Sequence, residues 1–215
     1  MSNFKETLKK LNSCQEAVDW VGDRDLEAAW AECDRGDWML WLAGLLRIDR
    51  NLLVLTACDC AEPALRYVPE SESRPAEALR VARAWCNGEA TSAEVQVAAV
   101  ASAEASVAAA YAYAAEIAAA DIDEIAAADI DAVASANAAV AAADAANAAN
   151  ATNVFAAANG TYNAAYTAAY AAAYAATDAA AARLASLKHS AELVRKRISV
   201  EVIRAALEPP TQEGE

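Results

Sequence analysis

An alanine-dominated run extends from residue 91 to residue 207 and restricts the fold more than any other feature of the sequence. Alanine has the best intrinsic helix propensity, and over so long a run the summed preference for helix is large. The pair Asn159-Gly160 interrupts the run, and this dipeptide is typical of turns. We therefore expect one long antiparallel helical hairpin over 91–207, with its turn near 159–160.

The charges of the run support the same hairpin. Residues 92–160 hold nine acidic side chains and no Lys or Arg, whereas the basic side chains of the run all follow Gly160. Opposite charges on facing helices attract each other. If the chain folds back at Gly160, we expect pairing between an acidic set (Glu116, Asp121, Asp123, Glu124, Asp129 and Asp131) and a basic set (Lys188, Arg195, Lys196, Arg197 and Arg204).

The large apolar side chains are concentrated before residue 87, where all five Trp lie. Trp38, Trp41 and Leu45 follow the spacing of a buried helical stripe. A period of two, which would indicate a strand, is absent from the whole sequence. We therefore predict an all-α protein with a Trp-rich helical domain over 1–90, the alanine-rich hairpin over 91–207 and a flexible acidic tail over 208–215.

Start and stop signals divide the first ninety residues into several short helices. Ser13 and Glu16 fit a capping box at the start of one helix, and Gly22 ends it. Asp25 is suited to cap the next helix, because its side chain can accept a hydrogen bond from the first turn. These signals predict several helices in this domain rather than one long helix.

The formal net charge of −14 restricts the classes of partner that the protein can bind. Such a surface repels nucleic acid and anionic lipid and favours a cationic partner. The longest uncharged run, 145–177, contains several Asn and few strongly apolar residues, which argues against a transmembrane helix. The first residues lack the apolar segment of a signal peptide, so we expect a cytoplasmic protein with reduced thiols.

The sequence contains no recognisable catalytic or metal-binding motif. Cys58 and Cys60 are separated by one residue, so on a helix their thiols point in different directions, and we expect buried core thiols. The single histidine, His189, lies opposite Asp131 in the expected hairpin, where a hydrogen bond is the simplest role. We therefore expect a non-enzymatic protein that binds no metal ion and no cofactor.

Tyr162, Tyr166, Tyr170 and Tyr174 recur at every fourth residue and form one row on a helix. Together with Phe155, they would lie at the uncharged tip of the expected hairpin. The row permits two interpretations: it packs inside the hairpin, or it is an exposed adhesive face, because Tyr is enriched in interface hot spots. Both interpretations remain open at the level of sequence.

Five segments of the sequence are distinctive: Ser-Cys-Gln-Glu-Ala-Val-Asp-Trp-Val-Gly (13–22), Trp-Ala-Glu-Cys-Asp-Arg-Gly-Asp-Trp-Met-Leu-Trp (30–41), Ala-Cys-Asp-Cys-Ala-Glu-Pro-Ala-Leu-Arg-Tyr (57–67), Arg-Ala-Trp-Cys-Asn-Gly-Glu-Ala-Thr (83–91) and Ser-Leu-Lys-His-Ser-Ala-Glu-Leu-Val-Arg-Lys-Arg (186–197). In these segments the sequence resembles the Imm-5-like immunity proteins of polymorphic toxin systems. The resemblance covers roughly 7–92 and 183–205, with an alanine-rich insert between them.

The resemblance implies a non-enzymatic protein that binds and neutralises a cognate bacterial toxin. On this interpretation the tyrosine row and Phe155 contact the toxin, and the acidic surface guides its approach. Two alternatives belong to other classes. One is a structural protein that self-assembles into homo-oligomers, and the other is an acidic mimic of nucleic acid that occupies the groove of a cationic protein.

Overall fold

The computed structural model describes residues 4–119, 125–151, 154–175 and 178–208. Within these ranges it contains eleven α-helices, one 3-10 helix and no strand, which confirms the all-α prediction. The helices are α1 (Phe4–Lys10), α2 (Gln15–Val21), α3 (Leu26–Glu32), α4 (Gly36–Leu45), α5 (Arg50–Ala61), η1 (Glu62–Tyr67), α6 (Arg74–Cys86), α7 (Ser92–Ala119), α8 (Ile125–Asn150), α9 (Val154–Tyr174), α10 (Ala179–Arg197) and α11 (Val200–Leu207).

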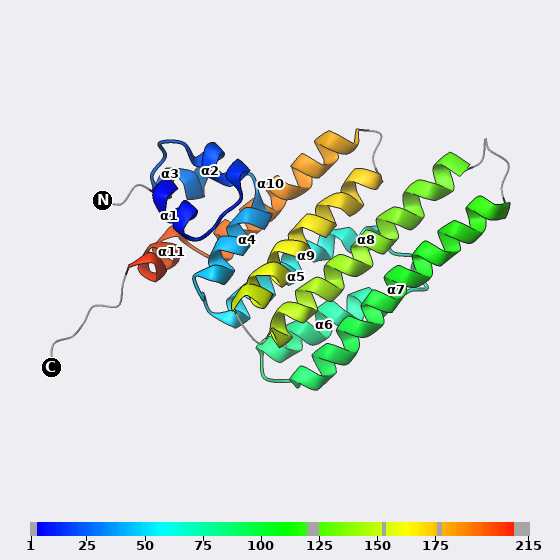
Figure 1. Cartoon of the computed structure of the whole chain (residues 1–215). Coiled ribbons are helices and arrows are strands. Elements are labelled where there is room, and N and C mark those ends of the chain that lie inside the picture. The colour runs from blue at the N-terminus through cyan, green and yellow to red at the C-terminus, as the bar shows by residue number, and fades with distance from the viewer. Residues whose placement is uncertain (1–3, 120–124, 152–153, 176–177, 209–215) are drawn as a thin grey trace.

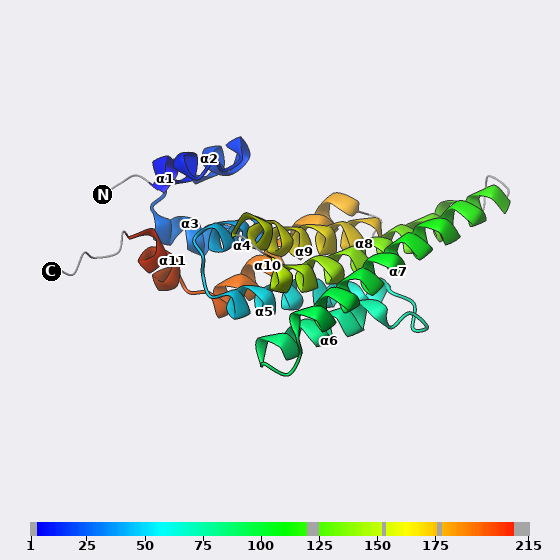
Figure 2. The ribbon, with the colours of Figure 1, turned by 60° about the horizontal axis from the view of Figure 1, so that its bottom comes forward.

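The alanine-rich helices form one layer of the molecule. Helices α7, α8, α9 and α10 lie side by side in chain order, and α4 packs against α9 and α10 (Figure 1). Helices α5 and α6 cover one face of this layer and contact α8. The short helices α1, α2, α3 and α11 gather at the end of the molecule where both termini lie (Figure 2). The other end of the layer, formed by α7 and α8, projects beyond the rest (Figure 2).

The turn expected at Asn159-Gly160 is wrong, because both residues lie inside α9. A Cβ atom at Gly160 would lie 3.2 Å from the carbonyl oxygen of Asp144 and 3.3 Å from Cα of Ala148. Glycine therefore serves here to bring α9 close to α8 rather than to reverse the chain. The strong helix propensity of the flanking alanines outweighs the turn signal. The single hairpin over 91–207 is replaced by a row of helices.

The boundary expected near residue 90 does not separate two cores. One cluster of buried side chains joins Val54 and Leu79 to alanines of α8 and α9, such as Ala142 and Ala168. A second cluster joins Phe4 of α1 and Leu40 of α4 to Ala165 of α9 and Val194 of α10. The alanine-rich helices are thus part of the same packed body as the Trp-rich segment and do not project from it as a separate arm.

Close approach between helices explains why small residues dominate these contacts. A Cβ atom at Gly44 of α4 would lie 2.5 Å from Cα of Ala158 on α9. A Cβ atom at Gly36 would lie 2.5 Å from Cβ of Ser190 on α10. Non-bonded carbon atoms pack at about 3.5–4.0 Å, so neither position has room for a side chain. Glycine at these positions allows the helix axes to lie closer together. Helix α4 is therefore held against both α9 and α10 at positions where the backbones nearly touch.

The charge pairing expected within the hairpin is also wrong for the basic residues that the structure describes. Arg204 pairs with Glu27, Arg197 with Asp59 and Lys188 with Asp34, all on the Trp-rich segment. Of the other basic residues, Arg195 binds carbonyl oxygens at the end of α3 and Lys196 is exposed. The acidic residues cannot be assigned partners: Glu116, Asp129 and Asp131 lie on helices but have side chains outside the described part, and Asp121, Asp123 and Glu124 lie wholly outside it.

Arg195 shows why the basic cluster turns toward the N-terminal helices. Its Nη1 donates to the carbonyl oxygens of Trp30 at 3.2 Å and of Cys33 at 2.8 Å, at the C-terminus of α3. The last carbonyls of a helix lack partners within the helix and carry partial negative charge. A guanidinium at that point satisfies them, so Arg195 fastens α10 to the end of α3.

None of the helices in the described part of the chain combines the length and the apolar character that crossing a bilayer needs. The flexible acidic tail was expected over 208–215, and its residues from 209 onward lie outside the part of the chain that the structure describes.

Candidate functional site

The four tyrosines of α9 form a continuous row of rings, which we call the tyrosine ladder (Tyr162, Tyr166, Tyr170 and Tyr174). The ring centroids of successive members lie 5.4, 4.8 and 6.3 Å apart. The hydroxyl of Tyr166 donates to the hydroxyl of Tyr170 at 3.0 Å. Because this bond needs the proton of the Tyr166 hydroxyl, it stabilises the neutral form and raises the pKa of Tyr166. The single row expected from the four-residue spacing is confirmed.

Arg183 of α10 lies over the middle of the tyrosine ladder. Its Cζ atom is 5.3 Å from the ring centroid of Tyr166 and 4.6 Å from that of Tyr170. A guanidinium over aromatic faces is attracted by the ring quadrupole. The stack fixes both rings and leaves one edge of the ladder open, since Tyr174 is 45% exposed. The ladder is therefore partly buried against α10 and partly exposed, on the side of a helix rather than at a tip.

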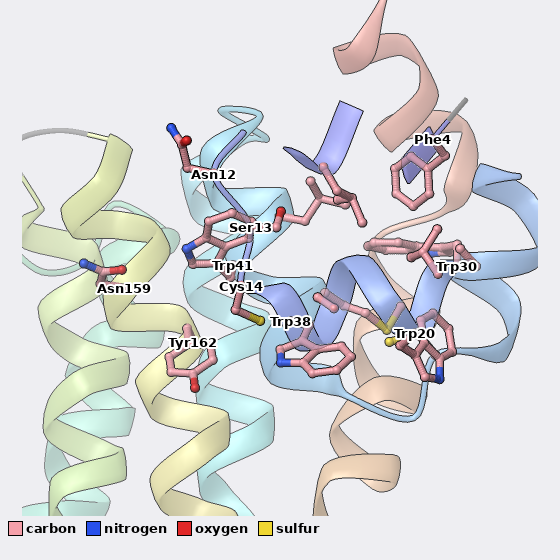
Figure 3. Close-up of a pocket in the computed structure, with 17 residues that line it drawn as sticks. Phe4, Asn12, Ser13, Cys14, Trp20, Trp30, Trp38, Trp41, Asn159 and Tyr162 are labelled. Carbon is pink, nitrogen blue, oxygen red and sulfur yellow. The ribbon is translucent and has the colours of Figure 1, made fainter. Parts of the chain in front are cut away.

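Phe155 was expected to share this surface. It lies in the first turn of α9, but its side chain falls outside the described part of the structure. Tyr162, in contrast, turns away from the surface of α10 and enters a cavity between α9 and the N-terminal helices (Figure 3).

This cavity, the aromatic pocket, has a volume of about 370 Å³ and lies between α1–α2 on one side and α3, α4 and α9 on the other. Figure 2 shows α1 and α2 as a pair of helices set above α3 and α4. The rings of the pocket surround a space that side chains do not fill (Figure 3). Its lining consists of Phe4, Leu8, Asn12, Ser13, Cys14, Ala17, Trp20, Val21, Ala29, Trp30, Cys33, Trp38, Met39, Trp41, Leu42, Asn159 and Tyr162.

Few polar groups reach the aromatic pocket. None of the residues that line it, so far as the structure describes them, carries a formal charge at neutral pH. Burial raises the pKa of Tyr162 to about 12, so its phenol keeps its proton. The hydroxyl of Ser13 is buried and has no hydrogen-bond partner among the described residues. An unpaired buried hydroxyl costs free energy, so a ligand that formed a hydrogen bond with this atom would recover part of that cost.

Ser13 does not cap α2 as its sequence context predicts. The N-cap residue is Cys14, and no side chain accepts a hydrogen bond from the first turn of α2. Glu16, the expected capping-box partner, instead forms an ion pair with Arg35 at 3.3 Å. The capping interpretation of Ser13 is therefore wrong, because α2 begins one residue later and the serine is left inside the pocket.

A buried ion pair supports the wall of the pocket. Arg35 donates through Nε and Nη2 to the two carboxylate oxygens of Asp37, at 2.9 and 2.7 Å. Asp37 is fully buried, so the pair needs both hydrogen bonds to offset the loss of water. The Cζ atom of Arg35 lies 4.1 Å from the ring centroid of Trp38. The ion pair therefore holds one of the indole rings that line the pocket.

The other candidates from the sequence lie elsewhere. Cys58 and Cys60 are free and buried, as expected, and burial raises the pKa of each thiol to about 12. His189 is exposed and faces Glu192 of its own helix, with Nδ1 3.9 Å from a carboxylate oxygen. Within the described ranges, no group of three or more His, Cys, Asp or Glu residues is arranged to hold a metal ion.

The arrangement is suited to binding. It offers an ordered row of tyrosines on one side of α9 and an open aromatic cavity where that row ends. Comparison of the chain with protein-family models, with curated proteins and with solved structures finds no match. The tyrosine row could be found from the sequence by its spacing. The pocket could not, because its walls come from segments more than a hundred residues apart, such as 12–14 and 159–162.

Proposed function

We propose that this protein acts in the cytoplasm as a non-enzymatic inhibitor that binds and neutralises a bacterial toxin. The observation that carries the proposal is the tyrosine ladder with Arg183 stacked on it. Tyrosine and arginine are enriched among the residues that contribute most to protein–protein binding. The resemblance of residues 7–92 and 183–205 to the Imm-5-like immunity proteins supports the class of the partner.

The ladder is ordered before any partner arrives. Stacking between neighbouring rings, the bond between the Tyr166 and Tyr170 hydroxyls and the guanidinium of Arg183 each restrict the rotamers of these side chains. Binding therefore costs little additional side-chain entropy. Tyr174 is the most exposed member, and we place it at the first contact with the toxin.

The acidic surface supports electrostatic guidance of a basic partner. The chain carries a formal net charge of −14, and acids such as Asp19 of α2, Glu32 of α3 and Asp34 of the loop after α3 are exposed. Complementary charge raises the association rate more than it raises the final affinity. Association should therefore slow as ionic strength rises, because salt screens exposed charges beyond about 10 Å.

The test uses two double variants in one capture experiment. Tyr166→Lys with Tyr170→Lys disrupts the ladder, and Val97→Lys with Val107→Lys adds the same charge to exposed positions on α7. We expect wild type and the α7 variant to retain the same protein from a lysate of the native cell, and the ladder variant to lose it. That protein is then purified and its toxicity is measured with and without each chain.

The outcomes separate the functional classes. Loss of toxicity with wild type and the α7 variant, but not with the ladder variant, supports the proposal. Capture of further copies of this chain alone, with a multimeric mass by light scattering, would support a self-assembling structural protein. Capture of a nucleic-acid-binding protein that dissociates steeply with salt would support an acidic mimic. Equal capture by all three chains would overturn the role of the ladder.

A further inference from the structure

We propose that the aromatic pocket binds a small, uncharged aromatic molecule, which stacks on its indole rings and forms a hydrogen bond with Ser13. This inference goes beyond the proposed toxin inhibition and does not depend on it. The pocket has a volume of about 370 Å³, which falls within the range of ligand sites in proteins. The α1–α2 pair forms one side of the pocket, and α3, α4 and α9 form the other (Figure 3).

The lining selects for an aromatic ligand. Six of the residues that line the cavity carry aromatic rings, and Figure 3 labels all of them: Phe4, Trp20, Trp30, Trp38, Trp41 and Tyr162. Aromatic rings gain from offset stacking and edge-to-face contact beyond the area that they bury. The rings in the pocket already pair in this way, since Trp20 and Trp38 meet edge to face with centroids 6.4 Å apart. A planar guest extends the same packing.

The surroundings of the pocket disfavour a charged ligand of either sign. An anion would find no cation among the described residues that line the pocket. The guanidinium of Arg35, which lies behind Trp38, is already bound to buried Asp37 through two hydrogen bonds. A cation would need the open faces of indole rings. The guanidinium of Arg24 already lies 4.8 Å from the centroid of Trp20, and that of Arg35 lies 4.1 Å from the centroid of Trp38. A second positive charge there would be repelled.

The hydroxyl of Ser13 gives the site its polar specificity. It is buried, it has no partner within the described part of the chain, and it belongs to the lining of the pocket. Within the described part of the chain, the Ser13 hydroxyl therefore lacks a hydrogen bond in the wall of the space that a ligand would occupy. A ligand with a single hydroxyl would satisfy that bond, whereas an otherwise identical hydrocarbon would leave it unmade.

The experiment compares four probes that share one ring system: naphthalene, 2-naphthol, 2-naphthoate and (2-naphthylmethyl)trimethylammonium. Binding to the full-length chain is measured at pH 7 by titration calorimetry and by quenching of tryptophan fluorescence. We expect 2-naphthol to bind best, naphthalene to bind about tenfold more weakly, and both charged probes to bind more weakly still. The variant Ser13→Ala should reduce the affinity for 2-naphthol to that for naphthalene and leave naphthalene binding unchanged.

Chemical blocking locates the probe without relying on a destabilising mutation. Cys14 lines the pocket and is exposed, whereas burial raises the pKa of the Cys86 thiol to about 11 and slows its alkylation. A bulky maleimide on Cys14 should abolish binding of 2-naphthol. The same treatment of Cys14→Ser should leave binding intact.

Several results would overturn the proposal. These are the absence of saturable binding by either uncharged probe, equal or tighter binding of a charged probe, and full retention of 2-naphthol after Cys14 is alkylated. A fourth is that no probe binds while alkylation of Cys14 releases the protein partner captured by wild type. That result would assign the pocket to a side chain of the partner.

Discussion

The two ends of this molecule are packed by opposite means. In the alanine-rich layer, α8 and α9 approach so closely that a Cβ atom on Gly160 would lie 3.3 Å from Cα of Ala148. Around α1–α4, large rings hold the helices apart, and a cavity of about 370 Å³ remains between them. Small side chains permit dense contact between backbones, whereas bulky rings from several short helices fill space less completely.

This contrast places dense packing and the cavity in different parts of one fold. Ala138, Ala142 and Ala145 of α8 are fully buried, so the layer offers no space to a ligand there. The rings at the other end are held by a few specific interactions, such as the stack of Arg35 on Trp38. The layer can therefore offer a partner only its surface, where the tyrosine ladder lies, whereas the short helices offer an internal cavity.

The same substitution should have opposite outcomes in the two regions, and this is the largest effect that we expect. Ala145→Leu adds a side chain to a fully buried position of α8 and should lower the free energy of unfolding by about 3 kcal/mol through overpacking. Ala17→Leu adds the same atoms beside the cavity and should change stability by less than about 1 kcal/mol. Urea denaturation measures both. Equal losses would contradict the contrast in packing.

Two glycines test how closely α4 and α8 approach α9. Gly44→Ala should lower the free energy of unfolding by about 2 kcal/mol, because its new Cβ would lie 2.5 Å from backbone of α9. Gly160→Ala should be nearly neutral, because its nearest contacts lie at 3.2 to 3.3 Å and alanine improves the helix propensity. Thermal unfolding of both variants provides the comparison. A larger loss at Gly160 would mean that α8 and α9 are the tighter pair.

Arg195 tests whether the two regions are joined through the end of α3. Arg195→Met keeps the aliphatic stem but removes hydrogen bonds from a charged group to two carbonyls, and should cost about 2 kcal/mol of stability. Arg204→Met removes an exposed ion pair with Glu27 and should change stability little. Chemical denaturation of the two variants is the measurement. Similar losses would show that the capping of α3 contributes nothing special.

Asp144 gives the smallest expected effect and adds a dependence on pH. Burial raises its pKa from the ordinary value of 3.8 to about 6, because the ionised form is poorly solvated. Between about pH 4 and pH 6 the unfolded chain is ionised while the folded chain keeps the proton, so stability falls as pH rises through this window. Above it the full penalty applies.

Asp144→Asn should therefore stabilise the protein at pH 7 by about 1 kcal/mol, after allowance for the solvent that screens a partly exposed carboxylate. The gain should vanish below about pH 4, where both states carry the neutral acid. Urea denaturation at the two pH values measures it. A gain of the same size at both would mean that ionisation is not its cause.

The sequence predicted helix content better than it predicted helix pairing. Helix propensity and periodicity are local, so they identified the all-α class and the single row of tyrosines on α9. Gly160 was misread because a missing Cβ serves a tight turn and a close helix crossing equally well. The register between alanine-rich helices was not readable either, because alanines carry no shape or charge that selects one partner over another.

The charged residues were misassigned for a related reason. Matching acids to bases along one chain assumes that the two arms face each other, yet Arg197 and Arg204 pair with Asp59 and Glu27 far away in sequence. The aromatic pocket was invisible for the same reason, since it joins residues near position 13 to residues near position 160. The local pattern around Ser13 predicted a helix cap and so gave no sign that this serine lines the pocket.

The interactions between α10 and α3 have a consequence for how the protein is made. The indole of Trp30 donates to the carbonyl oxygen of Ile198 at 3.2 Å, and Arg195 binds the carbonyls of Trp30 and Cys33. During synthesis α3 leaves the ribosome first, and it lacks these partners until Arg195, 165 positions beyond Trp30, has been translated. Exposed apolar surface in such an incomplete segment is prone to aggregation. We therefore expect translation speed and chaperone access to influence the yield of folded protein.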